Sequence, residues 1–145
     1  MSQLKSIAIK SIAKADMQTM QSAEITVAKG ISGDFRGSQT DRQVTILSES
    51  AWLKACDSLN TDLTWTIRRA NLLVDGVEFG AADVGKPVRI GEVELKITRE
   101  TNPCLLMDKQ CPGLTAALTP DWRGGVCCNV ITGGTIRIGD QVEIG

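Results

Sequence analysis

Short runs of alternating hydrophobic and polar residues recur along the chain and predict β-strands. Over residues 93–97, hydrophobic side chains take every second position, which is the period of a strand with one buried face. The pattern changes phase at residues 91–92, so we expect a turn there. The same reasoning predicts further strands over residues 6–12, 24–29, 42–47, 71–79, 88–90, 126–130, 136–138 and 141–144.

Two segments follow the longer period of a helix. Ser48 is expected to cap a helix whose hydrophobic stripe ends near Asn60. A second, short helix is expected from Pro112 to Pro120, because proline is favoured in the first turn and stops a helix further on. We also expect a hairpin turn at residues 133–134, and a long exposed loop over residues 29–42.

Many short strands with glycine turns and only two short helices predict a mainly β protein. A closed β-barrel of about seven or more strands is the favoured architecture, since closure removes exposed strand edges. A doubly wound parallel sheet is the weaker alternative, because it needs more and longer helices. The length of 145 residues suits a single domain over residues 1–145.

Composition excludes several functional classes. The net charge of −1 gives no electrostatic basis for binding nucleic acid or a membrane surface. No hydrophobic run is long enough for a signal peptide or a membrane span, so a cytoplasmic location is expected. The chain has no histidine and no tyrosine, which removes the commonest general base and the usual zinc ligands.

The five cysteines of the chain, an odd number, indicate thiols and not a disulfide framework. Cys104 follows a proline just beyond a predicted strand, where folds often place functional groups, and it is the candidate nucleophile. Cys56 and Cys128 fall among buried positions and are expected in the core. Cys111 and Cys127 are alternative resolving thiols.

Six sequence motifs in order resemble the MOSC domain. This module is found at the C-terminus of molybdenum cofactor sulfurases, in the mitochondrial amidoxime-reducing component and as small stand-alone bacterial proteins. The resemblance runs from about Gly30 to the end of the chain. The motifs are GISGD at 30–34, DRQVTIL at 41–47, RRANLLV at 68–74, IGEVELKITRETNPC at 90–104, PGL at 112–114, and DWRGGV followed by GGTIRIGDQVEI within 121–144.

The resemblance implies a β-barrel that binds the molybdenum cofactor or carries sulfur as a persulfide on Cys104. It also implies that Cys104 is a metal ligand, as in the reductase members, because thiolate is a natural ligand for molybdenum. The chain has no desulfurase domain, so pyridoxal phosphate would act only through a partner cysteine desulfurase. Whether the chain is an enzyme stays open. The alternatives are a reductase of N-hydroxylated compounds, supplied with electrons by a partner protein, and a non-catalytic interaction module.

Other polar residues are candidates for the cofactor site. Arg42, Arg69 and Arg123 lie at predicted strand ends, and a guanidinium matches the phosphate of a pterin cofactor by a forked contact. Asn71 offers amide donors and a carbonyl to a pterin edge. Asp34, in the glycine-rich loop, is expected to orient an arginine.

Overall fold

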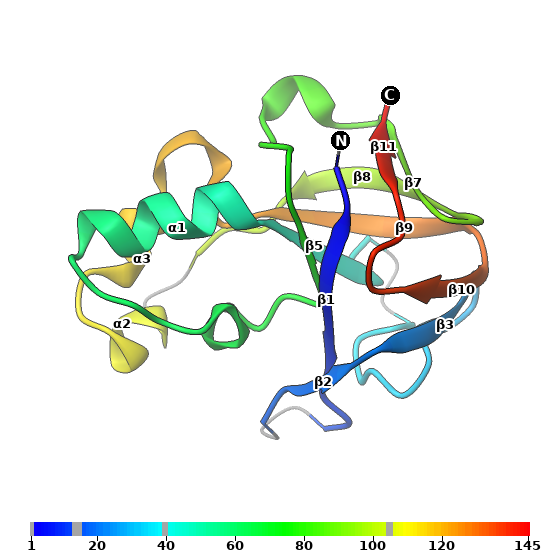
Figure 1. Ribbon diagram of the computed structural model, residues 1–145, viewed down its shortest axis with the longest axis horizontal. Helices are drawn as coiled ribbons and strands as arrows, with labels where there is room; N and C mark the ends of the chain where they lie inside the picture. The colour runs from blue at the N-terminus through cyan, green and yellow to red at the C-terminus, as the bar shows by residue number, and fades with distance from the viewer. Residues whose placement is uncertain (1, 13–15, 39–40, 104–105) are drawn as a thin grey trace.

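The computed structural model describes residues 2–12, 16–38, 41–103 and 106–145. Strands dominate this part of the chain (Figure 1). The strands are β1 Leu4–Ile9, β2 Gln18–Met20, β3 Ser22–Thr26, β4 Gly30–Ile31, β5 Val44–Ser48, β6 Leu72–Val74, β7 Pro87–Ile90, β8 Val93–Glu100, β9 Val126–Thr132, β10 Gly134–Arg137 and β11 Val142–Ile144. The helices are α1 Glu49–Ser58, α2 Leu106–Gln110 and α3 Leu114–Leu118, with short 3₁₀ turns η1 Trp65–Arg68, η2 Ala81–Asp83 and η3 Pro120–Trp122.

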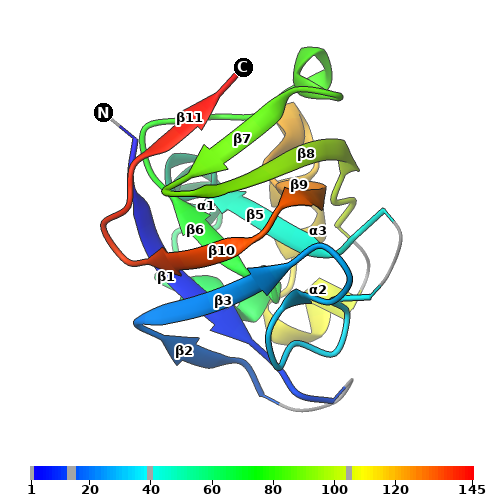
Figure 2. The same ribbon diagram turned by 90° about the vertical axis from the view of Figure 1, so that its right-hand side faces the viewer.

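The described strands form two sheets. An 8-stranded sheet has the order β11-β7-β8-β9-β5-β6-β1-β2, and a 3-stranded sheet has the order β10-β3-β4. The larger sheet is mixed, because β5 and β6 run parallel to each other while the other pairs of adjacent strands in this sheet run antiparallel. Figure 2 shows the smaller sheet lying across the larger one.

The central strands β5 and β6 of the larger sheet are buried on both faces. Ile46 of β5 and Leu72 of β6 belong to a hydrophobic core that also contains Ile25 and Ile136 of the smaller sheet. The next residues along each strand point the opposite way, as strand geometry requires, into a second core under the helices. That second core includes Leu47, Trp52, Leu73, Leu114 and Leu118.

The closed β-barrel predicted from the sequence is wrong. The larger sheet has two edge strands, β11 and β2, which do not pair with each other. After β2 the chain leaves this sheet to form β3 in the smaller sheet. The start of β1 approaches β11 only through an isolated bridge between Gln3 and Gln141 and a few adjacent backbone hydrogen bonds. Short edge strands, and not closure, limit the exposed edges of this sheet.

Several local predictions are confirmed. The Ser48 side chain caps α1 by accepting a hydrogen bond from the backbone N–H of Ala51 at 3.3 Å. The phase change at residues 91–92 is the turn between β7 and β8, which pair antiparallel. The predicted hairpin at residues 133–134 is wrong as a strand pairing, because β10 pairs with β3 and not with β9. Helix α2 was not predicted from the sequence.

Buried Arg68 connects three segments that are distant in sequence. Its Nε donates to the carbonyl oxygen of Gly124 at 3.1 Å, and its Nη2 donates to the carbonyl oxygen of Thr101 at 2.9 Å. The Arg68 side chain is only 6% exposed. A buried guanidinium that satisfies two backbone acceptors holds the chain after β8 and the chain before β9 against η1.

We predict that Arg68→Met destabilises the protein by about 2–4 kcal/mol, because it leaves two buried carbonyl groups without their charged donor. Urea unfolding followed by circular dichroism measures this change. The matched control is Arg89→Met, since Arg89 is half-exposed and its ion pair with Glu94 is on the surface. Equal unfolding free energies for the two variants would show that Arg68 does not hold these segments.

Candidate functional site

Three strands of the larger sheet place polar residues at one of its ends. Because β1 runs antiparallel to β6, and β5 runs parallel to β6, the end of β1 meets the beginnings of both other strands. Lys10 follows β1, Arg42 precedes β5, and Arg69 lies just before β6. The fold therefore brings together residues that the sequence places far apart.

Asn71 fixes the relative positions of these three strands. Its side-chain Oδ1 accepts hydrogen bonds from the backbone N–H and the hydroxyl of Thr45, at 3.0 and 3.1 Å. Its Nδ2 donates to the carbonyl oxygen of Ala8 at 3.1 Å. The backbone N–H of Ala8 donates in turn to the carbonyl oxygen of Asn71 at 2.7 Å. The Asn71 amide thus ties β1 and β5 to the beginning of β6.

The loop after β4 covers this end of the sheet. The carboxylate of Asp34 accepts the backbone N–H groups of Lys10 at 3.2 Å and Arg36 at 3.4 Å. The backbone N–H of Phe35 donates to the carbonyl oxygen of Lys10 at 3.0 Å. Gly37 closes the loop so tightly that an added Cβ would collide with the carbonyl oxygen of Lys29. The loop therefore holds Phe35 and Arg36 next to Lys10.

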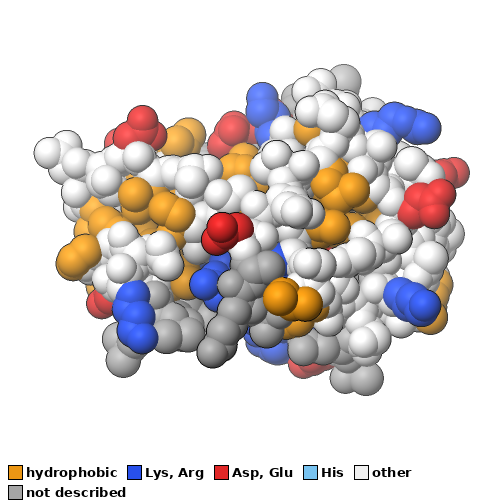
Figure 3. Space-filling view, turned by 90° about the horizontal axis from the view of Figure 1, so that it is seen from below, with side chains coloured by type: hydrophobic (Ala, Val, Ile, Leu, Met, Phe, Trp, Pro, Cys, Tyr) orange, Lys and Arg blue, Asp and Glu red, His pale blue; other side chains and the backbone are white. Residues whose placement is uncertain are grey.

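A small cavity of about 10 Å³ lies among these residues, room for about one water molecule. It is lined by Lys10, Met17, Asp34, Phe35, Arg36, Thr45, Arg69 and Asn71. Arg42 lies close enough to act electrostatically on both Lys10 and Arg36. We call this cavity, with Lys10, Arg36, Arg42 and Arg69 around it, the cationic pocket. Figure 3 shows Lys and Arg side chains on the face seen from below.

The cationic groups of the pocket disfavour one another's charge. Burial, and then the charges of Arg69 and Arg36, lower the pKa of Lys10, while Asp34 opposes this effect. Burial and the charge of Arg42 lower the pKa of Arg36 as well. The Phe35 ring lies under both cations, with its centroid 4.9 Å from the Lys10 ammonium and 5.0 Å from the Arg36 guanidinium. In addition, the Nε of Arg42 is buried and has no hydrogen-bond partner among the described residues.

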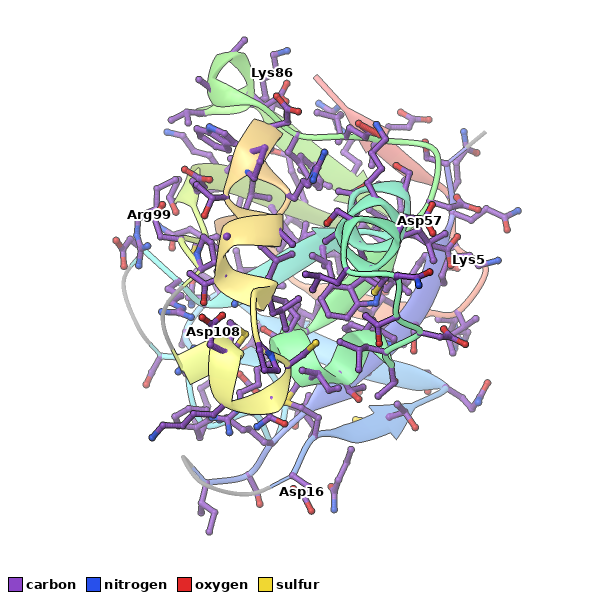
Figure 4. All side chains as sticks on the ribbon, turned by 90° about the vertical axis from the view of Figure 1, so that its left-hand side faces the viewer. Lys5, Asp16, Asp57, Lys86, Arg99 and Asp108 are labelled. Carbon is purple, nitrogen blue, oxygen red and sulfur yellow. The ribbon has the colours of Figure 1, made fainter. Side chains whose placement is uncertain are left out.

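A second, wider cavity adjoins the cationic pocket across Met17 and Arg69, which line both. It has a volume of about 240 Å³, and its other lining residues are Asp16, Thr66, Ile67 and Gln110. Figure 4 shows Asp16 on the segment below α2, the helix that ends at Gln110. Together the two cavities suit an elongated ligand that has an anionic end.

The structure brings together four of the residues predicted from the sequence. Asp34, Arg69 and Asn71 line the cationic pocket, and Arg42 lies beside it. Arg123 does not line either cavity; its Nη1 donates to the carbonyl oxygen of Ala117 at 3.1 Å. Cys104 lies outside the described residues, so its predicted roles as nucleophile and metal ligand stay predictions.

Lys10 and Arg36 were missed from the sequence. Lys10 directly follows the hydrophobic residues of β1, and Arg36 lies two positions after Asp34 in the glycine-rich loop. A basic residue at the end of a strand, like those chosen before β5 and β6, is the signal that could have identified Lys10. Nothing in the sequence shows that the loop folds back over β1, which is what brings in Arg36.

Three of the four described cysteines are buried: Cys56, Cys127 and Cys128. Cys56 and Cys128 belong to the two hydrophobic cores, as predicted. Burial raises the pKa of the Cys128 thiol far above its ordinary value. The Sγ of Cys127 lies 3.2 Å from the Thr101 hydroxyl. Cys111 is partly exposed.

No group of three or more metal-ligating side chains occurs among the described residues. None of the helices in the described ranges is long and hydrophobic enough to cross a membrane.

Comparisons with known proteins identify the family. The fold resembles three solved structures: YuaD from Bacillus subtilis (TM-score 0.81, 18% identity, 99% of this chain and 96% of that chain covered), YiiM from Geobacillus stearothermophilus (0.78, 15%, 100% and 75%) and YiiM from Escherichia coli (0.71, 15%, 99% and 69%). A family model for the MOSC domain matches residues 26–143. The chain therefore belongs to the MOSC domain family. The search of curated proteins finds no match.

We predict that Arg69→Gly gives a protein about 1 kcal/mol more stable than Arg69→Ala. The backbone of Arg69 is left-handed, with φ 64°. Glycine adopts this conformation without a steric cost, whereas a residue with a Cβ is strained in it. Both variants remove the same guanidinium, so urea unfolding isolates the backbone effect. An Ala variant as stable as the Gly variant would contradict a cost stored at this position.

We predict that a maleimide applied to the folded protein modifies Cys111 and leaves Cys56, Cys127 and Cys128 unmodified, because those three thiols are buried. Peptide mass spectrometry measures the modification of each thiol. The same experiment on Cys104→Ser tests the sequence-based prediction of a reactive Cys104, which should appear as one adduct fewer. Rapid labelling of Cys127 in folded protein would contradict the burial seen here.

Proposed function

We propose that this protein binds the molybdenum cofactor and holds the phosphate of that cofactor against Arg36 and Arg69 at the cationic pocket. Arg69 is exposed and Arg36 is half-buried, so both can contact a phosphate outside the cavity, which itself has room for about one water molecule. The observation that carries the proposal is that three cationic side chains, those of Lys10, Arg36 and Arg69, line one cavity and that Arg42 lies close to it, with Asp34 as the acidic residue that lines it. The Asp34 carboxylate already accepts two backbone N–H groups. The pocket thus has an excess of positive charge that a phosphate dianion would balance.

The residues of the pocket suit different parts of this task. Arg69 and Arg36 provide forked donors for phosphate oxygens, and Arg42 adds a positive charge beside them. The wider cavity beyond Arg69 gives room for the uncharged part of the ligand, with Thr66 and Gln110 as hydrogen-bonding side chains. We propose Cys104 as the protein ligand to the metal. The bound cofactor would supply molybdenum redox chemistry.

Sulfur transfer is the second activity that we propose for the same chain. Family membership and the position of Cys104 after Pro103 support a persulfide on this cysteine. A cysteine desulfurase is the proposed sulfur donor. If the cofactor-bound protein is instead a reductase, an electron-transfer protein is the proposed partner.

The test is to purify the protein from cells that make the cofactor and to measure its molybdenum and pterin content. We predict that the double variant Arg36→Gln/Arg69→Gln retains at least about tenfold less pterin than the wild type. A charge-assisted hydrogen bond to phosphate contributes about 1.5–3 kcal/mol, and about 1.4 kcal/mol corresponds to a factor of ten. The control double variant is Arg89→Gln/Arg137→Gln, because both arginines are exposed and lie outside the pocket.

Cys104→Ser separates the two parts of the proposal. It should lose molybdenum but keep pterin bound through the phosphate. Incubation of the wild type with a cysteine desulfurase and free cysteine should add the mass of one sulfur atom, and Cys104→Ser should not gain it. Wild-type pterin content in the Arg36/Arg69 variant would reject phosphate binding in the cationic pocket. Protein without cofactor or added sulfur under all conditions would favour an interaction module.

A further inference from the structure

Lys10 occupies an unusual position for a lysine. Lysine side chains are rarely buried, yet Lys10 is only 3% exposed. Both backbone polar groups of Lys10 are hydrogen-bonded, which fixes its backbone position. Its N–H donates to the Asp34 carboxylate, and its carbonyl oxygen accepts from the Phe35 N–H. Its ammonium lies over the Phe35 ring. The side chain therefore points into the cationic pocket and not toward bulk solvent.

The described charged groups that face Lys10 come from three elements. The loop after β4 contributes Asp34 and Arg36, the start of β5 contributes Arg42, and the turn between η1 and β6 contributes Arg69. Like charges in a partly dehydrated site destabilise one another, and a single carboxylate does not balance them. The Asp34 carboxylate also accepts two backbone N–H groups, those of Lys10 and Arg36.

The members of this cluster differ in how they can relieve the repulsion. A guanidinium stays charged at physiological pH because its ordinary pKa is very high. An amine loses its proton more readily when it is buried beside other cations. The pKa of Lys10 is lowered by that combination of burial and neighbouring guanidiniums. Lys10 is thus the group whose charge responds to the contents of the pocket.

We propose that Lys10 couples anion binding in the cationic pocket to the uptake of one proton. At a pH where the amine of the free protein has released its proton, binding of a dianion against the pocket makes the amine take a proton back and become an ammonium. The bound state is then an ammonium beside a dianion, with no change in covalent bonds. This inference rests on the anion site of the proposed function and adds the way in which pH controls that site.

The direction of the pH dependence follows from linkage. A bound dianion raises the pKa of Lys10, so the anion binds most tightly below the pKa of the amine in the free protein. As pH rises from that value to the higher pKa of the complex, the dissociation constant should increase by about a factor of ten per pH unit, as expected for one proton. Above both values the affinity becomes independent of Lys10.

The experiment is NMR of the full chain with ¹³C-labelled lysine, in which the Cε signals are followed from pH 6 to pH 11 with and without sodium sulfate. Sulfate is the probe because it stays a dianion throughout this range. We expect Lys10 to titrate below the ordinary pKa of a lysine, and saturating sulfate to raise the Lys10 midpoint by about one to three pH units. Chloride at equal ionic strength controls for screening.

Lys10→Arg is the matched variant, because it keeps the positive charge but cannot release its proton in this range. It should bind sulfate with an affinity that no longer falls with pH. A Lys10 midpoint at the ordinary pKa of a lysine, no shift at the highest soluble sulfate concentration, or an unchanged pH dependence in Lys10→Arg would each overturn the inference.

These outcomes are separate from those of the cofactor experiment. A sulfate-dependent shift of Lys10 in protein that never acquires molybdenum cofactor would support proton coupling and reject the proposed ligand. Cofactor held through Arg36 and Arg69, with a Lys10 that does not respond to sulfate, would do the opposite.

Discussion

The side-chain amide of Asn71 is the contact on which the arrangement of the site depends. It connects β1, β5 and the start of β6 with hydrogen bonds whose partners lie 26 and 63 residues away in the sequence. Because the amide is buried, losing one of these bonds would leave a polar group unsatisfied. The free-energy cost of that group is larger than the net stability that the bond contributes. The ends of three strands are therefore held at one level, and Lys10 and Arg69 are held with them.

The second constraint is the electrostatic repulsion among the cations of the pocket, which the rest of the fold offsets only in part. Four cations at or beside one small cavity repel one another, and Lys10, which is buried, has little water around it to screen this repulsion. The Asp34 carboxylate and the Phe35 ring offset part of this repulsion. The remainder is a cost that proteins accept mainly at functional sites, where a ligand of opposite charge removes it.

The sequence predicted local features well because their causes are local. The cap at Ser48 and the turn between β7 and β8 depend on a few neighbouring residues, and the structure contains both. Sheet order depends on which distant strands pair, and alternation does not encode that choice. The glycines at 133–134 end β9, but β10 then pairs with β3. Arg69 could be identified from the local sequence motif that contains it. Arg36 could not, because only the folding of its loop back over β1 brings it to the pocket.

The open sheet, in place of the barrel, also explains where a site can form. In a closed barrel every strand has two full neighbours, whereas here the chain leaves the larger sheet after β2 and builds a second layer. That departure lets the loop after β4 fold back over the end of β1 and cover Lys10. The pocket thus forms where the loop after β4 covers one end of the larger sheet. Asn71 holds the strands of that sheet together, and Asp34 holds the loop against them. A position covered in this way removes an amine from solvent without placing it in the hydrophobic core, so its charge can depend on a ligand.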